Sequence, residues 1–567
     1  MARPGALAAR VQMGTRPVGL SAWRGEATAL SLLGLAWAAL WLLTVPLGEF
    51  PLNDDWVYAL AVRSIVETRR YALPSPATAN VFAQAYWGAL FCLPFGFSFT
   101  ALRVSTCVLG MAGVLTLYLL LRELGGERRL AAIGALTLAV NPLYLCLSTS
   151  FMTDVPFTAL VTASLWLYVR GVKRGSAASI GGAFAVAFAA ILVRQFALML
   201  PLAFGVAHLL RKGPGLRSLA IAALPLLLGA ALHVGYERWV VSTGRTPLVF
   251  SPVSSLRPAS FVLFGLASLQ MTVRALPYIG LFVTPFAACF VLARRAPIAG
   301  LRALTVWLGS MGLGVVLLLL LRGAVLPVIG NILLPSGLGP LTLRDTYLLG
   351  RNLPDPSWLR LLWPAATAWG ALVTGFVLVV AGTMLVRVAG AALRSWDLRP
   401  AWPQALLLTI IGAYAAGLFV IGYQAFWFDR YLILFIPPVL GLLVLAVGGS
   451  APRAVAPAAA VLGLYALFSV LGTHDYLAWN RARWRALADL QASGVSPRQI
   501  DGGYEFNGWL LYDPRYEKTT GKSWWWVQGD EYMIASGPMP GYAQVASYPF
   551  DRWLIPGRSE VLALRRE

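Results

Sequence analysis

The chain has 567 residues, of which 58% are apolar and only 12% are charged, and its net charge is +21. An ordinary globular chain carries about 25% charged residues, so this composition excludes a water-soluble globular enzyme, a disordered chain and a nucleic-acid-binding domain. The excess positive charge lies within residues 1–472, because residues 473–567 hold 11 basic and 11 acidic side chains. The sequence therefore predicts an integral membrane protein with a soluble C-terminal region.

Apolar segments recur along residues 27–472. A helix that crosses a bilayer needs about 20 mostly apolar residues. The predicted spans are 27–48, 100–121, 130–148, 156–171, 177–193, 196–210, 217–236, 275–293, 302–321, 363–386, 404–424, 431–448 and 454–472. We therefore expect an α-helical polytopic membrane protein with about 13 transmembrane helices, in which the first helix is retained rather than cleaved as a signal peptide.

The distribution of Lys and Arg indicates the orientation, because cytoplasmic loops are enriched in them. With the N-terminus inside, the inner segments hold 20 basic and four acidic residues, against 14 and nine outside. We expect a cytoplasmic N-terminus (1–26), a transmembrane domain (27–472) and an extracytoplasmic domain (473–567). The expected location is the cytoplasmic membrane of a bacterium.

Residues 473–567 read as a small α/β domain. Residues 475–495 have the spacing of an amphipathic helix, and YMIAS, YAQVASYP and SEVLALRR read as short strands between turns. The four cysteines lie in or beside apolar segments, and Cys and His show no metal-ligand spacing. We expect no disulfide framework, no metal and no cofactor.

Acidic residues at a membrane edge are expensive to place and are therefore functional candidates. Asp54 and Asp55 begin an amphipathic helix in the long first outer loop, 49–99, and Asp154 lies in the short loop before the fourth span. Alternatively, one of Asp54 and Asp55 could cap the helix while the other is solvated, and Asp154 could cap the helix that follows it. Two acids at the ends of separate helices favour a joint role, in which one deprotonates a hydroxyl group and the other positions it.

Basic and aromatic side chains occur at the same predicted edge. Arg194 and Arg430 are suited to holding a lipid-linked phosphate, because a guanidinium is always charged and can bind an anion with two N–H groups. They could equally extend to the membrane surface, or Arg430 could pair with Asp429 at a helix end. The aromatics of the stretch 75–96, and the tail motifs GGYEFNGW and SWWW, could stack on sugar or simply pack in the core or the interface.

This order of motifs resembles the GT-C glycosyltransferases. The likeness lies in paired acids opening the first outer loop, an acid before the fourth span and a late RYL…P helix. It is strongest for the branch with protein O-mannosyltransferases and the lipid A aminoarabinose transferase, and covers most of residues 27–472. The C-terminal pattern HDYLAWNRARW…IDGGYEFNGW also resembles bacterial members. The resemblance implies an inverting transfer of sugar from a polyprenyl-phosphate donor.

Roles follow from the resemblance residue by residue. Asp54 matches the acid proposed as base, Asp55 stands where the family usually has Glu, Asp154 matches the second-loop acid, and Arg430 matches a donor-phosphate contact. A Lys-Pro-Pro-like stretch that helps hold phosphate in the family is replaced here by FAQAYWG. We expect Asp54, Asp55 and Asp154 to be catalytic, and we expect Arg430, Arg194 and Arg63 to bind the donor phosphate. The expected contacts to the acceptor or the sugar are Tyr58, Gln84, Tyr86, Trp87 and Gln195.

We thus predict a glycosyltransferase that moves a sugar to a hydroxyl of a cell-envelope glycan, lipid or protein. The expected partners are the lipid-linked donor, that acceptor and membrane lipids, with no nucleic acid. Two alternatives stay open. One is an oligosaccharide transferase or polymerase, and the other is a transporter or flippase of lipid-linked sugar. A transporter is disfavoured because the acids lie in loops or at span ends rather than near the bilayer midplane. The sequence also has no P-loop.

Overall fold

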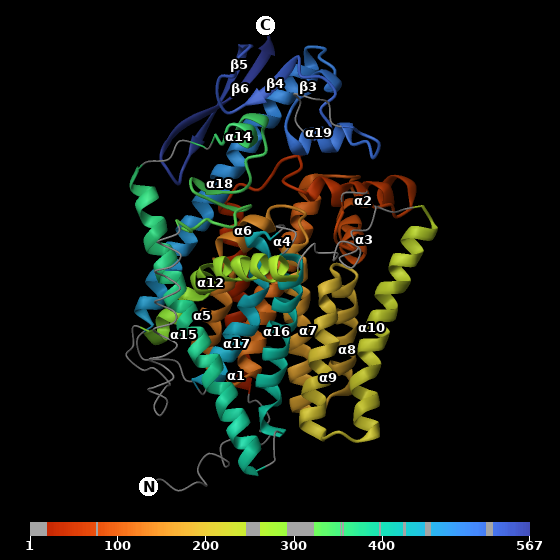
Figure 1. The fold of residues 1–567 in the computed structure, drawn as a ribbon, viewed down its shortest axis with the longest axis vertical. Coiled ribbons are helices and arrows are strands. Elements are labelled where there is room, and N and C mark those ends of the chain that lie inside the picture. The colour runs from red at the N-terminus through yellow and green to blue at the C-terminus, as the bar shows by residue number, and fades with distance from the viewer. Residues whose placement is uncertain are drawn as a thin grey trace.

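The computed structural model describes residues 20–74, 77–244, 261–291, 323–351, 353, 357–395, 399–422, 427–447, 455–517 and 525–567. The fold is mostly helical, with a bundle of apolar helices and a small C-terminal sheet (Figure 1). The bundle contains α1 (Leu20–Leu43), α4 (Phe99–Glu123), α5 (Arg128–Ala139), α6 (Pro142–Ser148), α7 (Asp154–Arg174), α8 (Ala177–Ile191), α9 (Met199–Lys212), α10 (Leu216–Ser242), α12 (Phe261–Val291), α15 (Ser357–Ser395), α16 (Trp402–Gly422), α17 (Ile436–Ala446) and α18 (Ala456–Ala492).

The predicted spans correspond to these helices. Among the described residues, nine helices are long and apolar enough to cross a membrane, or ten if the bent pair α5 and α6 forms one span. The predicted span 302–321 lies outside the described residues, and the other predicted spans each coincide with a helix or a broken helix. The helices of two predicted spans, α8 and α9, are shorter than a typical crossing helix, with 15 and 14 residues.

The break between α5 and α6 has a local cause. The two helices are bent by 61° at Asn141 and Pro142. Proline has no N–H to continue α5, and the Asn141 side chain caps α6 by accepting from the N–H groups of Leu143 and Tyr144. This bend leads the chain directly into the loop that carries Asp154.

One end of the bundle gathers the segments predicted to face the cytoplasm. Glu26 of α1 pairs with Arg122 at the end of α4 (2.6 Å) and with Arg128 at the start of α5 (3.7 Å). Arg174 at the end of α7 pairs with Glu123 on the same side (2.7 Å). The first 19 residues, with three of the four N-terminal arginines, lie outside the described residues.

The opposite end carries the long first outer loop, a short hairpin and the C-terminal region (Figure 1). The first outer loop forms α2 (Asp55–Thr68) and α3 (Phe82–Cys92), as the amphipathic patterns predict. A segment before α15 forms β1 (Leu333–Leu334), β2 (Gly337–Leu338) and α14 (Arg344–Leu348). A 3-10 helix, η5 (Asp429–Phe435), leads into α17, and another, η3 (Gln195–Leu198), into α9.

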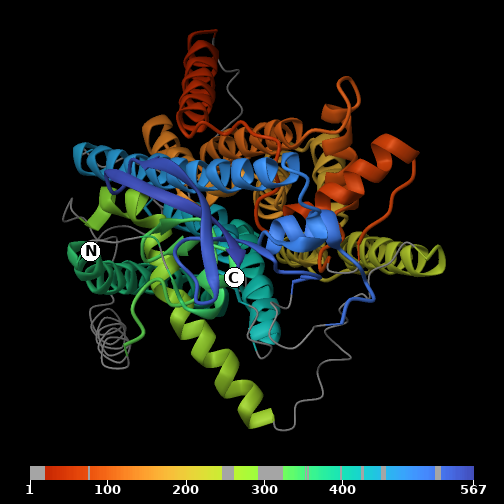
Figure 2. The ribbon, with the colours of Figure 1, turned by 90° about the horizontal axis from the view of Figure 1, so that it is seen from above.

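The C-terminal region is an α/β unit, as predicted. Its sheet has the order β3-β4-β6-β5, from β3 (Ile500–Asp501), β4 (Tyr532–Ala535), β5 (Tyr542–Arg552) and β6 (Gly557–Arg566). The pair β3 and β4 is parallel, and the other two pairs are antiparallel. The short helix α19 (Tyr504–Leu511) follows β3. Seen from above, this region lies over the centre of the bundle, whereas α1 and α10 lie at its edge (Figure 2).

The connection between the bundle and the C-terminal region is helical. The predicted last span and the predicted amphipathic helix form one helix of 37 residues, α18. The proposed domain boundary at residue 473 therefore falls inside a helix. Asp475 of α18 also accepts hydrogen bonds from the backbone N–H groups of Trp553 (2.6 Å) and Leu554 (3.1 Å), which ties the turn between β5 and β6 to this helix.

Candidate active site

Asp54 precedes α2, and its side chain is not used to cap that helix. The residue occupies the N-cap position, but it makes no side-chain cap hydrogen bond. Instead, its Oδ2 lies 2.8 Å from Nη2 of Arg430, and its Oδ1 accepts from the Tyr504 hydroxyl at 2.9 Å. The helix-cap reading of Asp54 is therefore wrong, and the carboxylate faces two side chains that are remote in sequence.

Asp154 begins α7 and is likewise not a cap. The N-cap residue is Thr153, which makes no side-chain cap bond. The Asp154 carboxylate is buried, with Oδ1 at 2.9 Å from Nη2 of Arg194 and Oδ2 at 3.8 Å from Nε of Arg430. Arg194 also donates to the Thr153 hydroxyl (2.7 Å). Burial opposes charge on Arg194, but the adjacent Asp154 carboxylate raises its pKa.

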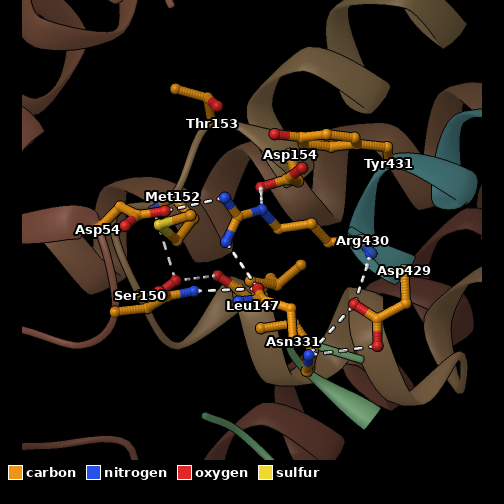
Figure 3. Close-up of polar contacts among 12 residues, drawn as sticks. Asp54, Leu147, Ser150, Met152, Thr153, Asp154, Asn331, Asp429, Arg430 and Tyr431 are labelled. Carbon is orange, nitrogen blue, oxygen red and sulfur yellow. Dashed lines mark hydrogen bonds and ion pairs between the residues drawn. The ribbon is translucent and has the colours of Figure 1, made fainter. Parts of the chain in front are cut away.

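Arg430 connects the two acids. Figure 3 shows its guanidinium reaching from η5 toward Asp54, Asp154 and Asn331. The side chain is only 4% exposed. Two carboxylates and two guanidiniums together form a cluster of balanced charge, in which Asp154, Arg194 and Arg430 are buried and Asp54 is partly exposed. We call Asp54, Asp154, Arg194 and Arg430 the charged cluster. An isolated buried charge is costly, whereas opposed and hydrogen-bonded charges can be held in this way.

Two residues orient Arg430. Its Nη1 donates to Oδ1 of Asn331 (2.7 Å), which also accepts from the side chain of Asn53 (3.3 Å). Asn331 has a backbone φ of 134°, a value that non-glycine residues rarely adopt. Asp429 holds this strained segment, because it accepts hydrogen bonds from the backbone N–H groups of Ile332 and Leu333. Asp429 is thus anchored to the loop, and the predicted alternative of an Asp429–Arg430 side-chain pair is not what the structure forms.

Asp55 has a different environment from Asp54. It is 1% exposed, and its two oxygens accept from the backbone N–H groups of Leu52 (2.7 Å) and Phe151 (3.1 Å). Burial raises the pKa of Asp55 to about 8, although these hydrogen bonds and Arg103 oppose that shift. Asp55 therefore ties the first outer loop to the loop before α7, and Asp54 is the acid that faces the charged cluster.

Two of the predicted acceptor contacts, Tyr58 and Gln84, are buried in the first outer loop. Tyr58 is buried in α2 beside the charged cluster, and burial together with the Asp54 charge raises its pKa. Gln84 is 1% exposed and donates to the backbone oxygen of Phe151 (2.9 Å), so it supports the loop before Asp154. Its Oε1 is buried without a hydrogen bond to the described residues.

The structure does not bring the remaining predicted residues into the charged cluster. Arg63 is exposed on α2, where it pairs with Glu67 at 2.9 Å, so the phosphate-binding role predicted for Arg63 has no geometric support. The Trp87 indole donates to the backbone oxygen of Ser105. Tyr86 is 42% exposed and contacts other aromatic rings, and Gln195 makes a long hydrogen bond to Thr78.

Several site residues were missed by sequence reasoning. Tyr504 and Asn331 contact the charged cluster directly, and the Tyr431 ring lies over both guanidiniums, 5.3 Å from Arg194 and 5.6 Å from Arg430. Tyr504 belongs to the GGYEFNGW motif, whose composition was the one available signal. Within the described ranges, no group of three or more His, Cys, Asp or Glu side chains is arranged to hold a metal ion.

The family comparison agrees with part of the resemblance noted in the sequence. Residues 82–234 match the model of the family described as dolichyl-phosphate-mannose-protein mannosyltransferase. This segment includes Asp154 and Arg194 but not Asp54 or Arg430. The resemblance is therefore confirmed for the segment that builds one half of the charged cluster. A comparison with the sequences of curated proteins gives no match.

Solved structures of membrane glycosyltransferases give distant matches. ArnT from Cupriavidus metallidurans bound to undecaprenyl phosphate is 14% identical, with 96% of this chain and 98% of that chain covered and a TM-score of 0.40. The S. cerevisiae protein O-mannosyltransferase Pmt1-Pmt2 complex bound to the sugar donor is 16% identical, with 46% and 39% covered and a TM-score of 0.33. At these TM-scores the matches give no residue correspondence.

Proposed function

We propose that this protein is a membrane glycosyltransferase that moves a sugar from a polyprenyl-phosphate donor to a hydroxyl group on the outer face of the cytoplasmic membrane. The observation that carries the proposal is the charged cluster, in which Arg430 bridges Asp54 and Asp154 at the end of the bundle beneath the C-terminal region. The match of residues 82–234 to a lipid-phosphate-sugar transferase family supports the same reaction class.

Asp54 has the position of a general base. Its carboxylate is 29% exposed, so it is the member of the charged cluster that an acceptor can approach. In the proposed reaction Asp54 takes the proton of the acceptor hydroxyl while that oxygen attacks the anomeric carbon. The bond from that carbon to the phosphate oxygen breaks, and the polyprenyl phosphate leaves with the electron pair. General-base catalysis of this kind contributes about 10²- to 10⁴-fold in rate.

The two guanidiniums suit the leaving phosphate. Arg430 and Arg194 lie on either side of Asp154, and both rest against the Tyr431 ring. Preorganised cations stabilise the charge that develops on a leaving group without reorganising during the reaction. Asp154 Oδ2 and Arg430 Nε are buried, and neither forms a hydrogen bond to the described residues. The two atoms face each other at 3.8 Å, so part of the hydrogen-bonding capacity of this ion pair is unused in the structure.

A transfer assay tests the proposal. Purified protein in lipid vesicles is given a panel of radiolabelled polyprenyl-phosphate sugars and a cell-envelope extract that supplies acceptors. The wild type should move label from the lipid to a second product, and Asp54→Asn should reduce the rate at least 10²-fold. Glu67→Gln is the matched control, because it neutralises an exposed acid on α2 and should retain the wild-type rate.

The alternative functions give different results in the same assay. A flippase would carry labelled lipid across the vesicle bilayer without consuming it, and this outcome would refute the transferase. A polymerase or oligosaccharide transferase would ignore monosaccharide donors and consume lipid-linked oligosaccharides. Asp54 directly precedes α2 and Asp154 begins α7, so both acids lie at helix ends rather than midway along a span, which favours the transferase over the flippase.

A further inference from the structure

The C-terminal region contributes a side chain to the charged cluster. Tyr504 is the first residue of α19, and its hydroxyl donates to Oδ1 of Asp54 at 2.9 Å. The other carboxylate oxygen of Asp54 faces Arg430. The proposed base is therefore held between one group from the helical bundle and one group from the C-terminal region, 450 residues away in sequence from Asp54.

A second contact, next to the one between Tyr504 and Asp54, fixes how α19 is aligned with the first outer loop. Glu505, next to Tyr504, accepts from the backbone N–H of Asn53 at 3.0 Å, and Asn53 is next to Asp54. Glu505 is fully buried and forms an ion pair with Arg483 of α18 (2.8 Å), which is also fully buried. Two adjacent residues of α19 thus bind two adjacent residues of the first outer loop, and a buried ion pair anchors them to α18.

The packing around α19 leaves little room for displacement. A Cβ atom at Gly508 of α19 would lie 2.4 Å from the Trp56 ring, so this helix rests directly on α2. Gly503, just before α19, has a φ of +87°, and a Cβ there would lie 2.7 Å from Arg483. A side chain at Gly508 would push α19 away from α2 and carry the Tyr504 hydroxyl with it, and one at Gly503 would collide with Arg483 in a left-handed backbone conformation that favours glycine.

We infer that Tyr504 is a positioning residue for Asp54, and that the C-terminal region which carries it is part of the catalytic machinery rather than an appended module. This inference rests on the proposed function and deepens it. A hydroxyl that donates to a carboxylate fixes the direction in which the carboxylate's free lone pairs point. The Tyr504 hydroxyl thereby aims Asp54 at the acceptor, while contacts to the donor phosphate are left to Arg430 and Arg194.

The test is Tyr504→Phe, which keeps the ring and its aromatic contacts with Trp56, Trp525 and Trp526 and removes only the hydroxyl. We expect kcat for sugar transfer to fall about tenfold or more, while KM for the polyprenyl-phosphate donor stays within about twofold of the wild type. Tyr542→Phe is the matched control. It removes a hydroxyl that bonds to Asp530 within the C-terminal sheet, and kcat should stay unchanged.

A Tyr504→Phe variant with wild-type kcat would overturn the inference, and so would an equal fall in the Tyr542→Phe control. A rise in donor KM without a fall in kcat would also overturn it, because it would place Tyr504 in donor binding. If the phenylalanine variant is not recovered folded, Tyr504→His is the second variant, because it keeps an aromatic ring but is too short to place a donor where the Tyr504 hydroxyl lies, and kcat should fall to the same extent. The transfer rate of the wild type distinguishes failure of the proposed function from failure of the Tyr504 inference. An inactive wild type refutes the transferase function, whereas an active wild type with an equally active Tyr504→Phe variant refutes only the role of Tyr504.

Discussion

Removal of Arg430 should destabilise the protein through a specific unbalanced charge. The charged cluster holds two acids and two arginines, so Arg430→Met leaves it with one excess negative charge. Asp154 keeps Arg194 at 2.9 Å, whereas Arg430 is the cation that pairs with Asp54. Breaking a buried ion pair by removing one partner costs about 3–5 kcal/mol. We expect about 3 kcal/mol, at the lower end, because the Asp54 side chain is 29% exposed.

A second substitution tests which acid is left unpaired. Asp54→Asn in the Arg430→Met background should restore much of the lost stability, because it removes the unpaired carboxylate. Asp154→Asn in the same background should not, because it leaves Arg194 without its closest acid. Coupling between contacting residues typically amounts to about 0.5–3 kcal/mol, which is large enough to measure.

The assay is an unfolding titration of the purified protein in mixed micelles. It compares the wild type, Arg430→Met, the two double variants, and the single variants Asp54→Asn and Asp154→Asn at one pH. The expected order of stability is wild type, then Arg430→Met with Asp54→Asn, then Arg430→Met alone. Equal recovery by the two Asp→Asn substitutions would refute the reasoning, because it would mean that Asp54 and Asp154 share Arg430 equally. Additive losses would refute the pairing altogether.

Three further predictions concern residues around the charged cluster. Arg63→Ala should leave transfer within about twofold of the wild type in the vesicle assay, because Arg63 forms an exposed pair with Glu67, and such pairs contribute at most about 1 kcal/mol. Asp55→Asn should flatten the dependence of melting temperature on pH. The pKa of Asp55 is raised to about 8 in the folded chain, so the contribution of Asp55 to stability falls as the pH rises from about 4 to 8. If the melting temperatures of wild type and variant changed in parallel over this pH range, the raised pKa would be contradicted. Arg483→Met should lower stability by about 3–5 kcal/mol in the unfolding titration, because it leaves the buried Glu505 without its ion partner, and an unchanged midpoint would argue against the pair.

The sequence contained enough information to predict the helices and the four residues of the charged cluster, but not the way in which these residues pair. Apolar runs and the clustering of Lys and Arg depend on local composition, so the spans, α2 and the strands β4 to β6 could be predicted from the residues alone. Asp54, Asp154, Arg194 and Arg430 could be selected because charged residues at the ends of apolar runs are rare. Their pairing could not be predicted, since Arg430 and Asp54 are 376 residues apart.

The errors have a common physical origin. Arg63 lies on α2, the amphipathic helix that Asp54 directly precedes, and sequence alone does not tell which polar side chains of such a helix turn toward a site and which toward solvent. Adjacent acids pose the same problem, since the sequence does not tell that Asp54 faces Arg430 whereas Asp55 is buried against the loop before α7. Asn331 and Tyr504 were missed because neither residue type is rare in loops, and only the folded chain places them beside Arg430 and Asp54.

The continuity of α18 sets a limit on how the two parts of this molecule can be altered. A helix of 37 residues is about 55 Å long, which exceeds the roughly 30 Å thickness of a bilayer's hydrocarbon core. Each residue advances a helix by about 1.5 Å and turns it by about 100°. An insertion or deletion of a single residue between the apolar part of α18 and Arg483 would therefore rotate Arg483 away from Glu505, and the C-terminal region cannot be exchanged with that of a relative unless the helical phase is preserved.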